Sequence, residues 1–355
     1  QGSIQELLIN HPFFRHLDFT TISNNCKLIK CINCQTISNP DAEKTELPVF
    51  EKKRYSDSDQ TNQTIQIDGI SEPVTRSFLQ AKILEKSVVK IEDSRILDIG
   101  CFDGNLLFEL DAMLSNAELW GFDINPHLEF VFPNKLNMNF ISEDLNDLEG
   151  QFDLIILSHS IMYIPDLNYL MISINHLLKD NGILFIQIPN IKANKLYSLM
   201  GDQNFIFTEI SLKNVLFNFG YKVRIIKNDF FPRELLIIAK KGQSSTVIKE
   251  DNLFEKNIEK INLFRYELEK INEQNLAVLG TTINAAFVHE IIGQRIQFFV
   301  EENISKIGKT FRGEEVVNPK YLNDTSHTLL PYGELGYKIQ ERFQSKYNGD
   351  FKVVL

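Results

Sequence analysis

The stretch RILDIGCFDGNL, residues 95–106, decides the fold of this chain. Its residues Ile96, Leu97 and Ile99 predict a buried parallel strand, and the run NLLFELDAML directly after it predicts a helix. Gly100 and Gly104 let the backbone between strand and helix turn sharply and approach a ligand at a place where a Cβ would clash. The loop is therefore predicted to hold a ligand at the carboxyl end of the strand.

Short apolar runs alternate with helical patterns from about residue 94 to residue 240. Such alternation predicts an α/β fold, with a Rossmann-like, mostly parallel sheet and helices on both of its faces. The last two apolar runs, KVRIIKN and ELLIIAKK, are separated only by a short turn at residues 229–233. We therefore expect an antiparallel hairpin at one edge of the sheet.

The loop chemistry separates two classes of ligand. A dinucleotide site has glycine in the third slot of the loop, so that a pyrophosphate can lie against bare helix amides, but here Asp103 occupies that slot. An acidic loop repels phosphate, whereas a ligand with a sulfonium and an amino group fits Asp98 and Asp103. Asp123 follows the next predicted strand, where a carboxylate can accept hydrogen bonds from both hydroxyls of a ribose. Asp144, after the third strand, can hold an adenine edge.

These motifs, D-x-G-C-F-D-G, then G-F-D, then E-D-L, resemble the class I S-adenosylmethionine-dependent methyltransferases. Residues 152–189 are also similar to the fourth strand, helix and fifth strand of that superfamily. The resemblance implies S-adenosylmethionine as the cofactor. It also implies a cofactor site lined by Asp98, Gly100, Cys101, Asp103, Gly104, Asp123, Ile124, Asp144, Leu145 and Ser158.

The regions on either side of this core predict two further parts. We expect an N-terminal cysteine-containing module at residues 4–70, a catalytic domain at 71–242 and a smaller C-terminal α/β domain at 243–355. Residues 1–3, Gln-Gly-Ser, are interpreted as the scar of a protease-cleaved tag and are left out of the fold.

The C-terminal part resembles the corresponding domain of the three-domain sugar C-methyltransferases, which act on nucleotide-linked deoxysugars. The resemblance rests on LAVLGTTINAAF and on a K-x-G-K-x-x-x-G run that begins at Lys306, and it spans roughly residues 26–335. It implies a nucleotide-linked sugar as the substrate. Where the family has repeated small residues, however, this chain has Gly280 followed by Thr281, Thr282 and Asn284, which could hydrogen-bond a substrate.

The N-terminal module of that family binds zinc through two pairs of cysteines. Zinc takes four ligands, and this chain has one clean pair, Cys31 and Cys34, with Cys26 five residues ahead of it. The resemblance thus implies a zinc site that includes Cys26, Cys31 and Cys34. The alternative is a module that has lost its metal and is held together by its apolar residues.

The catalytic base is a second departure from that family, in which a glutamate–histidine pair precedes a Phe-Thr and a helix. Asp202 and Gln203 stand at those positions here, and a glutamine amide cannot accept a proton near neutral pH. Methylation of an oxygen requires only a hydroxyl held in line with the methyl group and a modest base. The candidate catalytic residues are therefore His159, Tyr163, Tyr55, Asp202, Gln203 and Glu209.

Composition limits the partners. The 355 residues carry a formal net charge of −10 and no block of Lys or Arg, which argues against nucleic acid or an anionic membrane as the main partner. No apolar run is long enough for a transmembrane helix, no secretory signal is evident, and the chain is expected to be cytoplasmic. We expect a methyltransferase of a nucleotide-linked sugar; the alternatives are an O- or N-methyltransferase of a glycan or small metabolite, and a non-catalytic protein that binds nucleotide or sugar.

Overall fold

The computed structural model describes residues 3–16, 18–42, 64–65, 74–87, 93–114, 116–130, 132, 135–242 and 250–354. Contacts within the chain group it into two compact units. The first, called the core unit, comprises Gln1–Glu6, Ile29–Ala193 and Gln203–Asp251. The second unit comprises Leu7–Leu28, Asn194–Asp202 and Asn252–Leu355. The predicted division at residues 70 and 242 stays a prediction.

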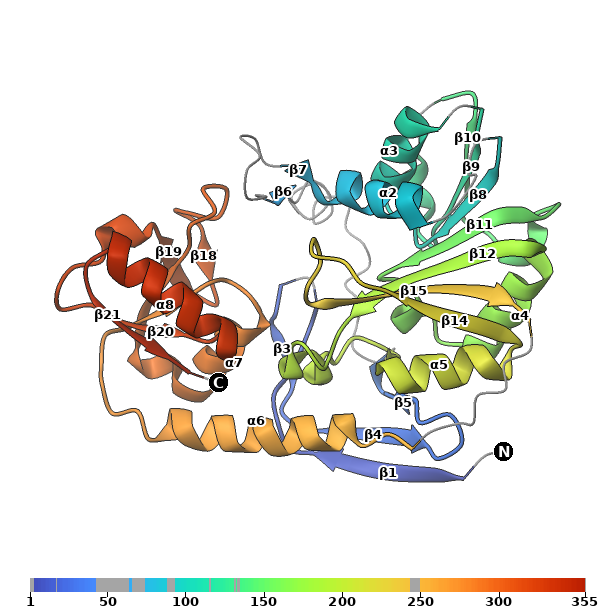
Figure 1. Cartoon of the computed structure of the whole chain (residues 1–355). Coiled ribbons are helices and arrows are strands. Elements are labelled where there is room, and N and C mark those ends of the chain that lie inside the picture. Colours follow the sequence, from blue (N-terminus) through green and yellow to red (C-terminus); the bar gives the residue numbers. More distant parts are fainter. Residues whose placement is uncertain are drawn as a thin grey trace. The chain divides into compact units, whose positions relative to one another are not determined.

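The core unit is built on a seven-stranded sheet in the order β10-β9-β8-β11-β12-β15-β14 (Figure 1). The strands from β10 to β12 are parallel to one another, and β14 and β15 form the predicted antiparallel hairpin at the edge. The strand order changes direction between β8 and β11, which is where open α/β sheets bind their ligands. The strands are β8 (Arg95–Ile99), β9 (Glu118–Phe122), β10 (Met138–Ile141), β11 (Phe152–Ser158), β12 (Leu178–Pro189), β14 (Tyr221–Ile226) and β15 (Glu234–Lys241).

Helices cover both faces of this sheet, as the sequence predicts (Figure 1). Helices α2 (Arg76–Ser87) and α3 (Asn105–Met113) pack on the face that includes Ile96 and Phe185. Helices α4 (Leu167–Leu177) and α5 (Glu209–Asn218) pack on the face that includes Leu97. Because the central strands are buried on both faces, they are apolar along their whole length rather than alternating. The expected Rossmann-like α/β core is confirmed.

Short strands form three further sheets. A smaller sheet has the order β1-β4-β5-β13, and the pairs β2-β3 and β6-β7 form two-stranded sheets. Their bounds are β1 (Ile4–Ile9), β2 (Phe13–Phe14), β3 (Thr21–Ser23), β4 (Cys26–Cys31), β5 (Ile37–Ser38), β6 (Thr64–Ile65), β7 (Val74–Thr75) and β13 (Phe205–Ile206). The 3-10 turns are η2 (Pro126–Phe130), η3 (Leu145–Asp147), η4 (Ile161–Tyr163) and η5 (Lys195–Leu199).

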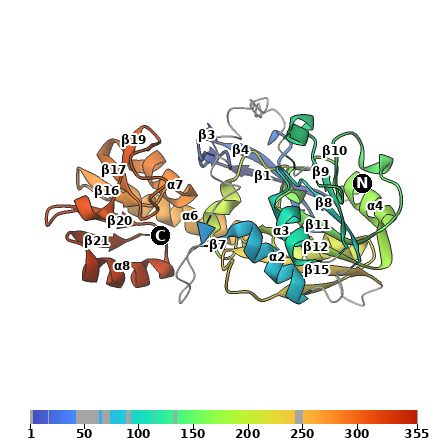
Figure 2. The ribbon, with the colours of Figure 1, turned by 90° about the horizontal axis from the view of Figure 1, so that it is seen from above.

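The second unit has its own six-stranded sheet, in the order β18-β19-β17-β16-β20-β21, in which only the β18–β19 pair is antiparallel. Helix α8 packs on one face through Phe343, and α7 lies on the other (Figure 2). Phe287 of α7 stacks on Phe264 of α6. The elements are α6 (Leu253–Glu269), β16 (Leu276–Leu279), α7 (Ile283–Ile292), η6 (Gly293–Arg295), β17 (Ile296–Val300), β18 (Thr310–Phe311), β19 (Glu314–Val317), η7 (Pro319–Tyr321), β20 (His327–Leu330), α8 (Glu334–Lys346) and β21 (Asp350–Val353). In the described part of the chain, no helix is long and apolar enough to span a membrane.

Candidate cofactor site

The loop between β8 and α3 lies at the point where the strand order changes direction. The backbone N–H of Gly100 donates to the carbonyl of Phe122 at 2.7 Å, which ties the loop to the end of β9. Gly100 has φ +81°, and a Cβ added there would lie 2.4 Å from the Cβ of Ser160. The loop therefore packs directly against the segment that follows β11.

Gly100→Ala should destabilise the protein strongly. A left-handed backbone costs an L-residue about 1–2 kcal/mol, and the clash with Ser160 adds overpacking of about 1–3 kcal/mol. Gly220→Ala is the matched control, because Gly220 has φ +82° but nothing within 4 Å of its added Cβ. Urea unfolding should show a clearly larger loss of unfolding free energy for Gly100→Ala. Equal losses would mean that the contact with Ser160 is absent.

Asp98 lies under this loop and is only 3% exposed. Among the described residues, its Oδ1 atom has no hydrogen-bond partner. Burial and, secondarily, the charge of Asp123 raise the pKa of Asp98 to about 7. A buried, unpartnered carboxyl group beside a second one fits a cationic ligand, because positive charge would stabilise both carboxylates.

Asp123, at the end of β9, is fixed by the backbone. Its Oδ2 accepts a hydrogen bond from the N–H of Phe102 at 3.2 Å, and its Oδ1 accepts one from the N–H of Asn125 at 3.0 Å. Burial raises the pKa of Asp123 although both hydrogen bonds oppose this. The next residue, Ile124, is 71% exposed, so a flat apolar surface is available beside the carboxylate.

The other predicted loop residues shape the backbone. Gly104 has φ +76° and precedes the first turn of α3, while both carboxylate oxygens of Asp103 accept hydrogen bonds from Asn105. Cys101 is 6% exposed, and a Cβ added at Gly121 would lie 2.7 Å from its Sγ. Cys101 therefore packs into the sheet beneath the loop, where burial raises the pKa of its thiol well above its usual range.

Asp144 follows β10 and is the acid predicted to hold an adenine edge. Its carboxylate accepts hydrogen bonds from the hydroxyl of Tyr169 and, at 2.8 Å, from the N–H of Asn146. The bond from Tyr169 lowers the pKa of Asp144. Leu145 is buried behind it. Tyr169 was not predicted from the sequence; it comes from α4, and no local pattern links it to Asp144.

Ser158 ends β11, and His159 follows it directly. The hydroxyl of Ser158 accepts a hydrogen bond from Gln80 at 2.8 Å. His159 has φ +56°, and its Nε2 lies 3.0 Å from Oε2 of Glu234, the first residue of β15. Sequence reasoning found neither Glu234 nor its partner Arg76; the one local signal was a polar residue, Gln187, inside the apolar run ILFIQIP.

The remaining catalytic candidates have other partners. Tyr163 accepts a hydrogen bond from the amide of Gln203 at 3.4 Å, so these two residues come together in the core unit. Glu209 is the first residue of α5 and forms an ion pair with Lys213 one turn along, as an ordinary acid at a helix N-terminus does. Tyr55 lies outside the described residues.

Asp202 belongs to the second unit. It is 7% exposed, its Oδ2 accepts a hydrogen bond from the N–H of His16 at 2.8 Å, and its Oδ1 has no partner among the described residues. Burial raises its pKa to about 6. A carboxyl group of this kind can exchange a proton near neutral pH, so Asp202 stays a predicted catalytic residue.

The three clustered cysteines do not converge. Cys26 and Cys31 are the two ends of β4, and an extended strand of that length separates them by about 16 Å. Cys31 lies beside Cys34, whose N–H and thiol lower the pKa of Cys31 against the effect of burial. No group of three or more His, Cys, Asp and Glu side chains in the described part of the chain could hold a metal ion. The structure therefore gives the predicted zinc site no support.

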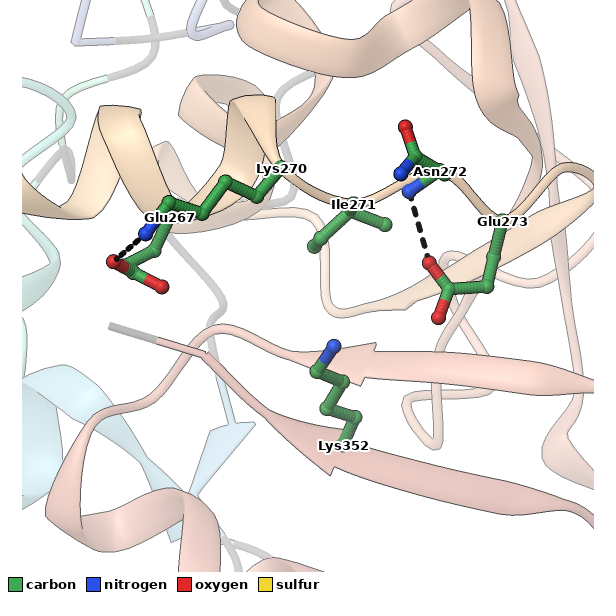
Figure 3. A pocket seen from close by; sticks show the side chains of 6 residues that line it. All are labelled: Glu267, Lys270, Ile271, Asn272, Glu273 and Lys352. Carbon is green, nitrogen blue, oxygen red and sulfur yellow. Dashed lines mark hydrogen bonds and ion pairs between the residues drawn. The ribbon is translucent and has the colours of Figure 1, made fainter.

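A surface hollow of about 480 Å³ lies within the second unit between the end of α6 and β21 (Figure 3). Its charges are compensated locally. Lys270 pairs with Glu267 at 3.0 Å. The backbone N–H of Glu273 and, to a lesser extent, the charge of Lys352 lower the pKa of Glu273. None of its lining residues is a predicted site residue. Among the described residues that line it, none has a buried polar side-chain atom without a hydrogen-bond partner, so this hollow is not the candidate site.

Three features are those of a class I methyltransferase core and fit S-adenosylmethionine: the loop between β8 and α3 where the strand order changes direction, the carboxylate of Asp123 after β9, and Asp98, whose Oδ1 has no partner among the described residues. Residues 75–224 match a family model described as a methyltransferase domain. This chain is an S-adenosylmethionine-dependent methyltransferase, which sets aside the alternative of a non-catalytic binding protein.

Similar proteins are mostly methyltransferases. The tRNA U34 carboxymethyltransferase of Campylobacter jejuni subsp. doylei is 25% identical over 242 residues, which are 62% of this chain and 81% of that protein. Human N-acetylserotonin methyltransferase in complex with SAM is 21% identical, with a TM-score of 0.38 over 47% of this chain and 51% of its own. The glycopeptide N-methyltransferase MtfA with S-adenosylmethionine is 10% identical, with a TM-score of 0.39 over 50% and 99% of the two chains.

Proposed function

We propose that this enzyme transfers a methyl group from S-adenosylmethionine to a small sugar substrate, with a nucleotide-linked sugar as the first candidate. The observation that carries this is His159, which directly follows β11 and precedes Ser160, the residue that packs against Gly100 of the cofactor loop. The cofactor supplies an electrophilic methyl group on a positively charged sulfur. The chain supplies the remaining steps: it binds the cofactor, orients the acceptor and removes the acceptor's proton.

Each step has candidate residues. Asp123 would hold the ribose, Ile124 and Asp144 the adenine, and Asp98 the cationic end of the cofactor, all at the carboxyl edge of β8, β9 and β10. The acceptor would then meet the methyl group at the end of β11, where His159 can take its proton. A hydrogen-bonded imidazole is a suitable base for a reaction near neutral pH.

The sugar substrate has support from the second unit. After β16, Gly280 turns with φ +89°, and Thr281 accepts a hydrogen bond from Lys306 at 2.9 Å. Asn284 donates to the carbonyl of Pro331. Hydroxyl, amide and ammonium groups at the carboxyl end of a parallel strand suit a polyhydroxylated, anionic ligand. The resemblance to sugar C-methyltransferases points to the same substrate class.

A second candidate is O- or N-methylation of a glycan or small metabolite. Gln203 favours it, because its amide donates to Tyr163 and cannot serve as the base that C-methylation beside a keto group demands. Because this chain is similar to tRNA U34 carboxymethyltransferases, tRNA is a third substrate to test. The formal net charge of −10 disfavours it.

Transfer of a labelled methyl group tests the proposal. The purified enzyme would receive S-adenosylmethionine labelled in its methyl group and, separately, keto-sugar nucleotides, free glycans, amines and tRNA. Label should enter the nucleotide-sugar pool and not tRNA, and NMR of the product would locate the new methyl group on carbon or oxygen. Label in tRNA alone, with none in any sugar or small metabolite, would overturn the proposal.

A further inference from the structure

A buried polar cluster lies at the carboxyl edge of the core sheet, formed by Arg76, Gln80, His159, Gln187 and Glu234; we call it the Glu234 cluster. Glu234 pairs with Pro189 across the antiparallel β12–β15 ladder, so its carboxylate lies level with the ends of β11 and β12. Arg76 begins α2 and stacks over the ring of Phe231 at 4.7 Å. The cluster therefore joins four separate parts of the sequence at the predicted acceptor end of the site.

The hydrogens of this cluster follow from which of its groups can donate and which can only accept. One nitrogen of the Arg76 guanidinium, NH2, lies 2.6 Å from Oε1 and 2.7 Å from Oε2 of Glu234, and 2.9 Å from Nε2 of His159. An arginine NH2 group has two hydrogens and accepts none. The two carboxylate oxygens lie in nearly the same direction from this nitrogen, so one hydrogen serves both of them and the other can point at His159. If Nε2 of His159 accepted that hydrogen, Nε2 and Oε2 of Glu234 would be two acceptors in direct contact.

The contact between His159 and Glu234 then requires its hydrogen on the imidazole. Nε2 lies 3.0 Å from Oε2 of Glu234, which as a carboxylate can only accept. Burial would raise the pKa of Glu234, but the Arg76 guanidinium, which contacts both carboxylate oxygens, lowers it, so the carboxylate is ionised also beside a neutral His159. A neutral His159 therefore carries its hydrogen on Nε2.

The rest of the cluster fixes this arrangement. Gln80 donates to Oε1 of Gln187 at 3.1 Å, which leaves the amide NH2 of Gln187 to donate to Glu234. The backbone N–H of His159 donates to the carbonyl of Gln187 at 2.8 Å and anchors the residue in its left-handed conformation. Among the described residues, Nδ1 of His159 has no hydrogen-bond partner, and the side chain is 24% exposed.

We propose that Glu234 is a positioning residue that holds His159 in the Nε2–H tautomer, so that Nδ1 accepts the proton of the substrate. This inference rests on the proposed function. In the step, the acceptor atom forms its bond to the methyl group and its proton passes to Nδ1. The bond between the methyl group and sulfur breaks, and its electron pair stays on sulfur. Glu234 stays ionised and stabilises the imidazolium, as the carboxylate of a catalytic triad does.

Nitrogen-15 NMR of the histidine rings tests this without a substrate. Protein labelled with ¹⁵N-histidine would be recorded at a pH where the rings are neutral, and the signals of His159 would be assigned from their loss in His159→Gln. The wild-type spectrum should show Nε2 protonated and Nδ1 bare. In Glu234→Gln, the variant's amide can donate to Nε2, so the signals should move toward the Nδ1–H tautomer.

Glu118→Gln is the matched control, because Glu118 also pairs with an arginine, Arg95, at 2.7 Å but lies at the start of β9. It should leave the His159 signals unchanged. If Glu234→Gln does not fold, Glu234→Asp replaces it and should reduce the Nε2–H population. A wild-type ring in the Nδ1–H tautomer would overturn the proposal, as would a Glu234→Gln ring that keeps its wild-type shifts.

The failure of the proposed function has a different signature. Methyl transfer and cofactor binding are measured separately from the tautomer. If the protein transfers no methyl group but His159 carries its hydrogen on Nε2, the proposed function is wrong and the pairing of His159 with Glu234 is correct. If the protein transfers methyl groups but His159 carries its hydrogen on Nδ1, only the positioning role of Glu234 is wrong.

Discussion

Asp123→Ala should weaken binding of S-adenosylmethionine by roughly 10²- to 10⁴-fold. A carboxylate that accepts two ribose hydroxyls supplies two charged hydrogen bonds, each worth about 1.5–3 kcal/mol, and every 1.4 kcal/mol is a tenfold change in affinity. The substitution also removes the acceptor for the N–H groups of Phe102 and Asn125, which loosens the loop. Titration calorimetry with S-adenosylhomocysteine measures the loss directly.

Two further variants separate these contributions. Asp123→Asn keeps an oxygen that can accept a hydrogen bond but loses the charge, and should bind with intermediate affinity. Asp180→Asn is the control for general effects of charge, because its side chain is fully exposed. If Asp123→Ala bound the cofactor as tightly as Asp180→Asn, the ribose would not lie on Asp123.

Asp98 should couple cofactor binding to the release of a proton. Its pKa is raised to about 7 by burial and by Asp123, so near pH 6.5 much of the protein carries it protonated. A cationic ligand favours the carboxylate and lowers that pKa. At pH 6.5, the heat of S-adenosylmethionine binding should therefore differ between phosphate and Tris buffers, and affinity should rise as the pH increases from 6 to 8. A heat independent of the buffer would contradict this.

The same carboxyl group makes the unliganded protein less stable as the pH rises. Between about pH 4 and pH 7, the unfolded chain ionises Asp98 while the folded chain keeps it protonated, so the folded state binds more protons. At 1.36 kcal/mol for each unit of pKa, this costs up to roughly 4 kcal/mol over that range. In Asp98→Asn, this part of the pH dependence of the unfolding free energy should disappear and cofactor binding should be lost. An unchanged dependence would mean that Asp98 ionises normally.

The core and its cofactor loop could be predicted because their signals are local. The strand at residues 95–99, the glycines after it and the carboxylate at the end of the next strand follow from hydrophobic pattern and turn chemistry over short stretches. The antiparallel hairpin at the edge of the sheet could be predicted for the same reason, because only a short turn separates its two strands, and the structure confirms it.

The Glu234 cluster could not be predicted, because its contacts are set by the tertiary fold. Arg76 and Glu234 are 158 positions apart in the sequence, and nothing near either residue indicates the other. The resemblance that implied a zinc site could not show how far apart its cysteines lie: the extended strand β4 places Cys26 and Cys31 at its opposite ends, so the structure does not support that site.

The central claim is that the loop at residues 98–104 and Asp123 bind S-adenosylmethionine. The most direct test is calorimetry of the wild-type protein with S-adenosylhomocysteine, repeated with NAD⁺. We expect one molecule of S-adenosylhomocysteine to bind per chain with micromolar affinity, and no heat from NAD⁺, whose pyrophosphate Asp103 would repel. Binding of NAD⁺ without binding of S-adenosylhomocysteine would contradict it.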